Sequence, residues 1–525
     1  MWLAILFTFV IAYIIYYFCF KPYNYWKNRN IVYEIPLPLV GNFGSTLLRK
    51  KHVSEVNEYL YKKYSNERYV GIYVFTKPAL LVRDIELIRR ICVEEFDHFS
   101  DRVTLFDKDF DSELGNVLTN LKGKQWKKTR DFLELVFAPA QMKGIFDLMS
   151  DCTETLVSRF SSEIETLVEV RLYDVFSKLE NDITCSTCFA AKNDDASFKM
   201  HQGLKNFGPM EKLKMSLIQI VPCIAELFEI QVYPTSKTEF FKKLIMEAIQ
   251  KQRSAHTPRH DFVHYLMEAK SGALHKERDE TIEVSDEESE VEKSDDSTTE
   301  WTDDAIATQA LIFLNSHSGL EPFITATSFV AYELALHPDV QVKLQEEIDN
   351  VLQTAKTTKV TYEAILKMKY LDCVVSESLR KWPPIYQIDR ECVKNYFEVD
   401  LSIPDDEKIV IEKGTAIIIP IMAIHRDPNY FPDPQRFNPE RFSAESRDGI
   451  APGTYIPFGY GPRRCIGSQF ALLQMKLLVF HLLSKFDLVP TENTRTHLEA
   501  SPFKCDRPSV AYTVLGLKHR KVTSL

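Results

Sequence analysis

Apolar residues recur every three or four positions over most of this chain, which is the spacing of a helix with one buried face. The period predicts helices over residues 53–64, 84–92, 125–136, 147–180, 237–252, 261–269, 304–336, 340–354, 362–382 and 467–486. The segment 304–336 is strongly apolar, so we expect it to cross the core. Runs typical of strands are fewer and fall at residues 69–75, 79–82 and 410–419. The expected fold class is mainly α with small β-sheets.

The first 20 residues contain no charged side chain, and 20 helical residues span about 30 Å, the thickness of a bilayer core. Lys21, Lys27 and Arg29 follow, which by the positive-inside rule places the rest of the chain in the cytosol. A cleaved signal peptide is the alternative, but the segment lacks a leading basic region and a small-residue cleavage site. We therefore expect a single-pass transmembrane helix over residues 1–20.

Residues 21–41 are basic and contain Pro36 and Pro38, which favour an extended, stiff connector. A single large body over residues 42–525 would follow it. Its ten cysteines are scattered through a chain too long to need a disulfide framework, which suits a cytosolic location. Cys185 and Cys188 form a lone C-x-x-C with no second pair nearby, so we interpret them as buried thiols rather than as a zinc or redox site.

The net charge of −10 comes from one stretch. Residues 277–304 hold 14 acidic and two basic side chains among Ser and Thr, so we expect a disordered, solvated loop there. A partner-binding or phosphorylation role for this loop stays open. The rest of the chain is close to neutral, which argues against nucleic-acid binding.

One loop carries the strongest chemical signal. Phe458, Gly461, Arg463, Cys465 and Gly467 form the pattern F-x-x-G-x-R-x-C-x-G. Glycines let a loop pass close to a flat cofactor, and free N–H groups with positive charge keep a thiolate ionised. A haem iron accepts a thiolate ligand. The alternative is a buried cysteine in a Gly-rich turn, but five specified residues in ten positions make that the weaker interpretation.

Here the chain resembles the cytochrome P450 superfamily. Its E-x-x-R motif occurs as Glu377 and Arg380, three apart on one helix face, and is followed by Asn-Pro-Glu-Arg-Phe around Arg441 and then by the cysteine loop. The resemblance covers about residues 30–525 and is nearest to microsomal enzymes of insect detoxification families. It implies haem b ligated by Cys465, with Glu377, Arg380 and Arg441 forming a structural network that holds the cysteine loop.

The resemblance also assigns the haem contacts. Trp126 and Arg130 match the family's W-x-x-x-R, whose two side chains share a helix face and reach one propionate. Arg390 and Arg463 match further propionate contacts, and Phe458 a contact with the haem itself. No C-x-x-C-H occurs, so covalent haem attachment is not expected.

Lysines at 122, 124, 127 and 128 cluster beside this helix. A solvated surface is the ordinary meaning of such a run. In membrane-bound members of the family this face docks an acidic NADPH-dependent flavoprotein reductase, which charge steering favours. Cytochrome b5 is a second candidate partner, and the resemblance places the enzyme in the endoplasmic reticulum membrane.

The chain departs from the family on the oxygen side of the haem. The family's [A/G]-G-x-[D/E]-T aligns with Ser318, Gly319, Glu321 and Pro322, so proline replaces the threonine that holds the proton-delivering water chain. Proline has neither hydroxyl nor N–H, and we expect a kink at this point. We take these four residues as the oxygen-side catalytic candidates, together with Ser316 and His317 as other proton donors.

Three functions remain open at this point. The first is a monooxygenase that inserts one oxygen of O₂ into a lipophilic substrate through another proton route. The second is a haem enzyme that rearranges a peroxide or dehydrates its substrate. The third is a catalytically impaired haem-binding protein. By resemblance, the substrate walls come from residues 99–121, 207–233, 311–325, 385–389 and 501–505.

Overall fold

The computed structural model describes residues 2–103, 114–163, 167–188, 210, 214, 235–254, 256–257, 259–274, 301–311, 319–355, 359–394, 396–399, 409–495, 503–504, 507–508 and 513–520. The larger helices are α1 (Trp2–Cys19), α3 (Val53–Lys63), α5 (Gly123–Val136), α6 (Pro139–Glu163), α7 (Leu172–Cys188), α11 (Thr235–Ser254), α12 (Phe262–Ser271), α13 (Asp303–Ala310), α14 (Leu320–Leu336), α15 (Pro338–Ala355), α17 (Lys369–Lys381) and α19 (Ser468–Lys485).

Shorter helical turns connect these elements. They are η1 (Lys21–Asn24), η2 (Lys27–Arg29), α2 (Gly44–Leu47), α4 (Ile85–Arg89), the π-helical turn η3 (Arg90–Glu94), η4 (Phe96–His98), η5 (Leu114–Asn116), α16 (Tyr362–Lys367), α18 (Ile421–His425), η7 (Pro439–Phe442) and η8 (Arg447–Gly449). The mainly helical class with small sheets is therefore confirmed.

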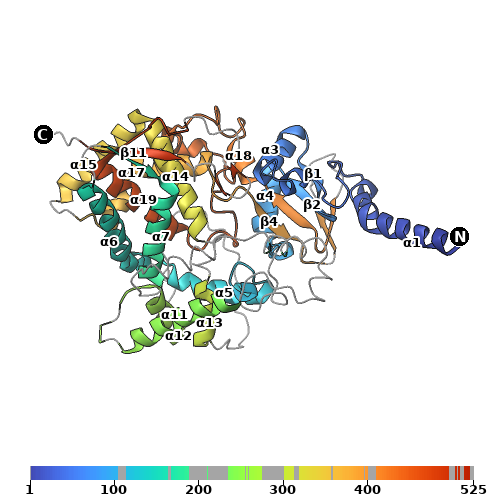
Figure 1. Ribbon diagram of the computed structural model, residues 1–525, viewed down its shortest axis with the longest axis horizontal. Coiled ribbons are helices and arrows are strands. Elements are labelled where there is room, and N and C mark those ends of the chain that lie inside the picture. The colour runs from blue at the N-terminus through green and yellow to red at the C-terminus, as the bar shows by residue number, and fades with distance from the viewer. Residues whose placement is uncertain are drawn as a thin grey trace.

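A four-stranded sheet has the order β1 (Tyr69–Val74), β2 (Lys77–Val82), β7 (Ala416–Ile419) and β4 (Ile388–Glu391), with β2 and β7 parallel and the other pairs antiparallel. Helices α3 and α4 lie beside this sheet at the end of the molecule that carries α1, whereas α6, α14, α15, α17 and α19 gather at the other end (Figure 1). The remaining pairings are β3 (Leu167–Arg171) with β11 (Val514–His519) and β8 (Phe486–Val489), β5 (Tyr396–Val399) with β6 (Ile409–Glu412), and β9 (Phe503–Lys504) with β10 (Arg507–Pro508).

The expectation of one helix over residues 147–180 was wrong. Helix α6 ends at Glu163, and the alternating segment Leu167–Arg171 forms β3 before α7 begins. Strand β3 pairs antiparallel with β11, which lies more than 300 residues later in the sequence. A partner so distant overrides the local helical period.

Three other predicted elements are divided. The segment 304–336 yields α13 and α14, and the residues between 311 and 319 lie outside the described part. The segment 362–382 breaks at Met368, whose extended backbone separates α16 from α17. The strand predicted over 410–419 becomes β6 and β7, because Gly414 turns the chain with a φ of +86°.

The core lies where α14 meets α7, α17 and α19. Every residue of α14 from Phe323 to Ala335 is buried, as the expected core-crossing segment requires. Phe329 of α14 stacks on Trp382, with ring centroids 4.5 Å apart and planes 4° from parallel. This packing fixes α14 against α17 and so places one wall of the site.

Helix α1 extends from the body at the N-terminal end (Figure 1). Its side chains include exposed Trp2, Phe7 and Phe9. In the described part of the chain, no helix has the length and apolarity of a membrane-crossing segment, so the predicted transmembrane helix is not confirmed. The connector is bound to the body through Trp26, which is fully buried and donates its indole N–H to the Ile72 carbonyl at 3.0 Å.

Most of the acidic stretch 277–304 lies outside the described residues. Its last two residues, Asp303 and Asp304, are helical and not part of a loop. They form the first turn of α13, which Thr302 caps. Acidic side chains are stabilised at a helix N-terminus. Asp303 also pairs with Arg253 and Lys270 at 2.9 and 2.8 Å.

Candidate active site

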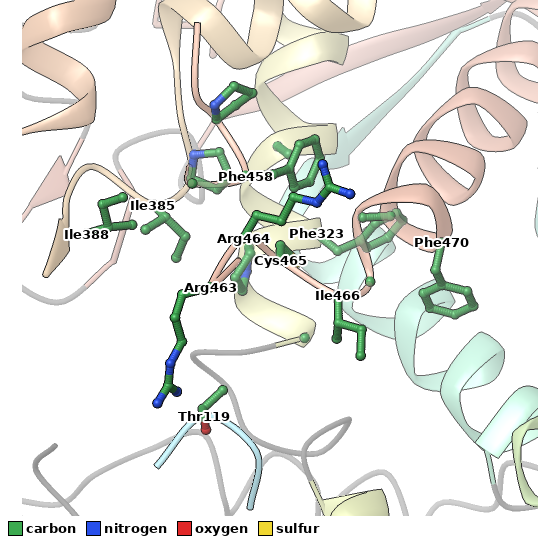
Figure 2. A pocket seen from close by; sticks show the side chains of 18 of the residues that line it. Thr119, Phe323, Ile385, Ile388, Phe458, Arg463, Arg464, Cys465, Ile466 and Phe470 are labelled. Atoms are coloured by element: carbon green, nitrogen blue, oxygen red, sulfur yellow. The ribbon is translucent and has the colours of Figure 1, made fainter. Parts of the chain in front are cut away.

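A cavity of about 360 Å³ lies beneath α14, within the ~300–1,000 Å³ typical of small-molecule sites. Its walls come from α5, α7, α14, α19, the segment 384–389 and the loop 457–467. Figure 2 shows Cys465 near its centre, with Phe323 of α14 and Phe470 of α19 close by. Apolar side chains dominate the lining, so the site suits a large, mostly apolar group.

The cysteine loop has a shape that only glycine permits at two positions. Gly459 and Gly461 have φ values of +85° and +73°. A Cβ on Gly461 would lie 1.9 Å from the Cys92 carbonyl oxygen. The amide of Cys465 donates to the Phe458 carbonyl at 2.8 Å, which closes the loop.

The sulfur of Cys465 lies just before α19, whose N-cap is Gly467. Burial raises the pKa of the Cys465 thiol, whereas the Gly467 amide and the charges of Arg102 and Arg130 lower it. The lowering groups are those that a thiolate ligand requires: an N–H donor, positive charge and a helix N-terminus.

A cluster of arginines borders the cavity, formed by Arg102, Arg130 and Arg463. Arg463 lies 4.0 Å from the ring centroid of Trp126 and donates to the carbonyls of Ser100 and Leu121 at 2.7 and 2.9 Å. Burial and the charge of Arg102 lower the pKa of Arg463 to about 9. Arg463 also pairs with Asp101 at 3.4 Å, but the positive charges of Arg102 and Arg390 oppose its own.

Two atoms near this cluster lack partners. Among the described residues, the Nε atoms of Arg102 and Arg390 are buried without a hydrogen-bond acceptor. Arg130 shares its guanidinium between Glu134 at 2.7 Å and the Arg464 carbonyl at 2.8 Å. An apolar slot with a thiol, a cationic border and buried N–H groups that lack acceptors fits haem, which has an apolar ring and two propionates.

The expected haem contacts are largely brought together. Trp126, Arg130, Phe458 and Arg463 all line the cavity with Cys465. Arg390 does not line it; the side chain is fully buried and donates to the Tyr460 and Asp389 carbonyls at 2.9 and 2.8 Å. Arg102 also lines the cavity. It falls within the expected substrate wall 99–121 but was not predicted as a haem contact, because an isolated arginine after Asp101 matches none of the family's motifs named above.

The network expected behind the cysteine loop is present in the geometry. Glu377 and Arg380 are both fully buried and are joined by two hydrogen bonds of 2.7 and 2.9 Å. The Nε of Arg441 lies 3.5 Å from the same Glu377 carboxylate. The three side chains therefore form a single charged unit.

His425 connects this unit to the cysteine loop and was missed from the sequence. Its Nδ1 binds the Arg380 carbonyl at 3.2 Å, and its Nε2 accepts the Ile456 amide at 2.9 Å. Burial and the charge of Arg380 lower its pKa to about 3. A neutral ring is needed for this bridge, since Nε2 must keep its lone pair. No sequence motif marks this histidine.

Only some of the candidate residues on the oxygen side line the cavity. Gly319 and Pro322 line the cavity with Phe323 and Ala326, whereas Glu321 does not. The Glu321 carboxylate accepts the Tyr173 hydroxyl at 2.9 Å, and its other oxygen is buried without a partner among the described residues. Ser316, His317 and Ser318 lie outside the described residues.

Pro322 does not kink a continuous helix. It is the third residue of α14, which begins at Leu320. The first turn of a helix has no internal acceptor for its N–H groups, so proline is tolerated there. The kink expected at Pro322 is therefore not observed, because this residue lies in the first turn of α14.

Of the expected substrate walls, residues 207–209, 211–213, 215–233 and 312–318 lie outside the described part, as do 104–113, 501–502 and 505. Leu118, Thr119 and the segment 384–389 are described; Pro384, Ile385, Gln387, Ile388 and Asp389 line the cavity with them. Cys185 and Cys188 are free, buried thiols, as expected.

The mainly helical fold and a cavity that joins a cysteine loop to a cationic border define a haem-thiolate class of protein. The family model for cytochrome P450 matches residues 33–512, and the chain belongs to this family. Members of the family bind haem b through a cysteine thiolate and act as monooxygenases, and this chain is such an enzyme.

Insect proteins are among the similar relatives. Cytochrome P450 9e2 of Blattella germanica is 35% identical over 544 residues, covering 98% of both chains. Probable cytochrome P450 9f2 of Drosophila melanogaster is 32% identical and covers 91% of both chains. Cytochrome P450 6B2 of Helicoverpa armigera is 32% identical and covers 93% of both chains.

Proposed function

We propose that this enzyme inserts one atom of O₂ into a lipophilic xenobiotic or endogenous molecule, with electrons from NADPH delivered by a flavoprotein reductase. The observation that carries the proposal is a single cavity that joins Cys465, the arginine cluster and apolar walls. When bound, haem supplies oxygen activation, and a thiolate ligand favours cleavage of the O–O bond.

Cys465 holds the iron in this proposal, and the Gly467 amide with the nearby arginines stabilises its thiolate. Arg102, Arg130 and Arg463 bind the propionates, with Trp126 packed beneath Arg463. The Glu377–Arg380 unit positions the loop through His425 and takes no part in the chemistry.

The walls support a lipophilic substrate. Phe323, Ile385 and Ile388 provide apolar surface, and Gln387 is a polar exception that bonds to Asn57. Such a lining orients a substrate by shape more than by charge. No observation on the described residues favours the peroxide-rearranging or the impaired alternative.

The reductase is proposed to dock on the outer face of α5, with cytochrome b5 as a second candidate. Lys124 and Lys127 are exposed on the same helix whose other face presents Trp126 and Arg130 to the cavity. An acidic partner on this face would lie one helix away from the haem site. Lys124→Glu with Lys127→Glu should raise the reductase KM and leave hydroperoxide-supported turnover unchanged.

We also propose attachment to the endoplasmic reticulum membrane, with the body in the cytosol. The uncharged α1, and the exposed apolar side chains of Ile35, Leu37 and Leu48 near the sheet, support a lipid contact. Deletion of residues 1–20 should shift the enzyme toward the soluble fraction. Alkaline carbonate extraction of the full chain then distinguishes a spanning α1 from a peripheral one.

Two measurements test the activity. The reduced, CO-bound enzyme should show the Soret band of a thiolate-ligated haem. Product formed with reductase and NADPH is then compared with product formed from a lipid hydroperoxide alone. Turnover only with the hydroperoxide would exclude the proposed monooxygenase.

A further inference from the structure

A buried carboxyl group lines the cavity from α7, an element other than the cysteine loop. Glu180 and Thr184 lie four residues apart on α7 and so share one helix face. Both are buried, with exposed fractions of 3% and 4%, and both line the cavity with Pro322 and Ala326 of α14. The acid is therefore inside the active-site wall and not on the surface.

Two neutral groups orient this carboxyl. The Thr184 hydroxyl donates to Glu180 Oε1 at 3.3 Å, and the side-chain amide of Gln474 donates to Oε2 at 3.1 Å. Gln474 belongs to α19, nine residues after Cys465, and is itself buried. Helices α7 and α19 thus hold this carboxyl in a fixed place, as a proton-transfer group requires.

The other acids near the cavity are placed differently. Asp389 is the second lining carboxylate among the described residues. It accepts a hydrogen bond from the Val103 amide at 2.6 Å, and its negative charge raises the pKa of Arg463. Glu321 is turned to Tyr173 and does not line the cavity. Neither Asp389 nor Glu321 is therefore placed to donate a proton into the cavity beneath α14 as directly as Glu180 is.

The described wall of α14 has no proton donor of its own. Its lining residues are Gly319, Pro322, Phe323 and Ala326, which carry no titratable side chain or hydroxyl. Monooxygenation consumes two protons for each O₂, because one oxygen atom leaves as water. Among the described residues, a proton source for the cavity therefore has to come from another element.

We infer that Glu180 is a proton-donating residue of this enzyme, acting in place of the hydroxyl that Pro322 lacks. This inference rests on the proposed NADPH-dependent function. RH, O₂, two electrons from NADPH and two protons give ROH and H₂O. The Glu180 carboxyl releases one of the protons, through water in the cavity, to the departing oxygen atom, and regains it from solvent.

The test uses the full-length holoenzyme with Glu180→Gln, which keeps the size of the side chain. The new amide oxygen can accept from Gln474, while the amide N–H donates to the Thr184 hydroxyl oxygen. Glu346→Gln, at an exposed position on α15, is the matched control. NADPH-supported product formation should fall by about 100-fold in Glu180→Gln, the lower end of the effect of a lost general acid. NADPH consumption should continue, with its electrons released as hydrogen peroxide.

Oxidation supported by iodosylbenzene separates proton supply from structure, because this donor transfers one oxygen atom without consuming protons. Glu180→Gln should keep its iodosylbenzene-supported rate and its CO-bound spectrum. Infrared spectra of the wild type across a pH titration should contain a protonated carboxyl band that is absent from Glu180→Gln and present in Glu346→Gln.

An equal loss of NADPH- and iodosylbenzene-supported turnover would overturn the inference, and so would NADPH-supported product within about twofold of wild type. Absence of the Glu180 band would overturn it as well. Wild-type enzyme that fails with NADPH and reductase would instead refute the proposed function. The two failures are therefore distinguishable.

Discussion

Gly461 packs directly against Cys92, so that a Cβ at position 461 would lie 1.9 Å from the Cys92 carbonyl oxygen. Two features exclude a side chain there, the contact and a φ of +73°. Cys92 belongs to the π-helical turn η3, which therefore supports the cysteine loop from below.

Gly461→Ala should displace this loop, lower the free energy of unfolding by more than about 2 kcal/mol and abolish most haem incorporation. Thermal denaturation and the haem-to-protein absorbance ratio measure both effects. Gly449→Ala is the control, since no atom lies within 4 Å of its Cβ position. Full haem content in Gly461→Ala would contradict the role given to this contact.

Cys465→Ser should remove the thiolate-ligated Soret band of the reduced, CO-bound enzyme, because a hydroxyl is a poor ligand for the iron at neutral pH. Circular dichroism should show an unchanged helix content. Cys152→Ser is matched in chemistry; Cys152 donates its thiol to the Asp182 carbonyl and does not line the cavity. A band that survives in Cys465→Ser would exclude this residue as the ligand.

Arg102→Leu should weaken haem retention by about 10- to 100-fold, as expected when a charge-assisted hydrogen bond is lost. Transfer of haem to apomyoglobin measures the rate of loss. The exposed Arg159→Leu controls for removal of a positive charge. An unchanged transfer rate in Arg102→Leu would mean that the propionates are bound by other groups.

Protonation of His425 should destabilise the fold in acid. Its folded pKa of about 3 lies below the unfolded value of 6.5, so its contribution is present above pH 6.5 and declines as the pH falls toward 3. Between pH 7 and pH 5 this loss amounts to about 2 kcal/mol of unfolding free energy.

His425→Phe removes that titration. Denaturant unfolding at the two pH values should show a less stable protein at pH 7 but a smaller decrease between pH 7 and pH 5 than in wild type. The same decrease in both proteins would show that His425 does not carry this pH dependence.

Pro322→Thr should raise the fraction of NADPH electrons that appear in product, because it places a hydroxyl on the cavity wall. The first turn of α14 accepts threonine without losing a helical hydrogen bond. Pro322→Ala, which adds no hydroxyl, should leave the coupling as in wild type. If both variants behave alike, backbone freedom and not the hydroxyl explains the change.

Elements with strong local signals could be predicted from the sequence. The segment 467–486 became α19 with its ends nearly unchanged, and the cysteine loop takes positive φ at Gly459 and Gly461. The strand β3 could not be predicted, because its partner β11 is remote and its residues continue an apparent helical period. Local pattern carries no information about such a pairing.

The residues of the site likewise fall into those that the sequence predicts and those that it does not. Cys465, Trp126, Arg130 and Arg463 belong to motifs with fixed spacing, and all line one cavity. Arg102 was predicted only as part of the wall 99–121, and Glu180 was not predicted to line the cavity. Neither residue belongs to a motif with fixed spacing, so their places depend on tertiary packing. The orientation of Glu321 toward Tyr173 likewise depends on how α7 meets α14.

Trp26 anchors the N-terminal segment to the sheet by close packing. Its ring covers Gly71 so closely that a Cβ there would lie 2.6 Å from the indole, and it follows the end of α1 by only a few residues. Any surface that holds α1 therefore also sets the tilt of the sheet β1–β2–β7–β4. Because β4 brings Ile388 and Asp389 to the cavity, the contact at Trp26 links the position of α1 to one wall of the reaction centre.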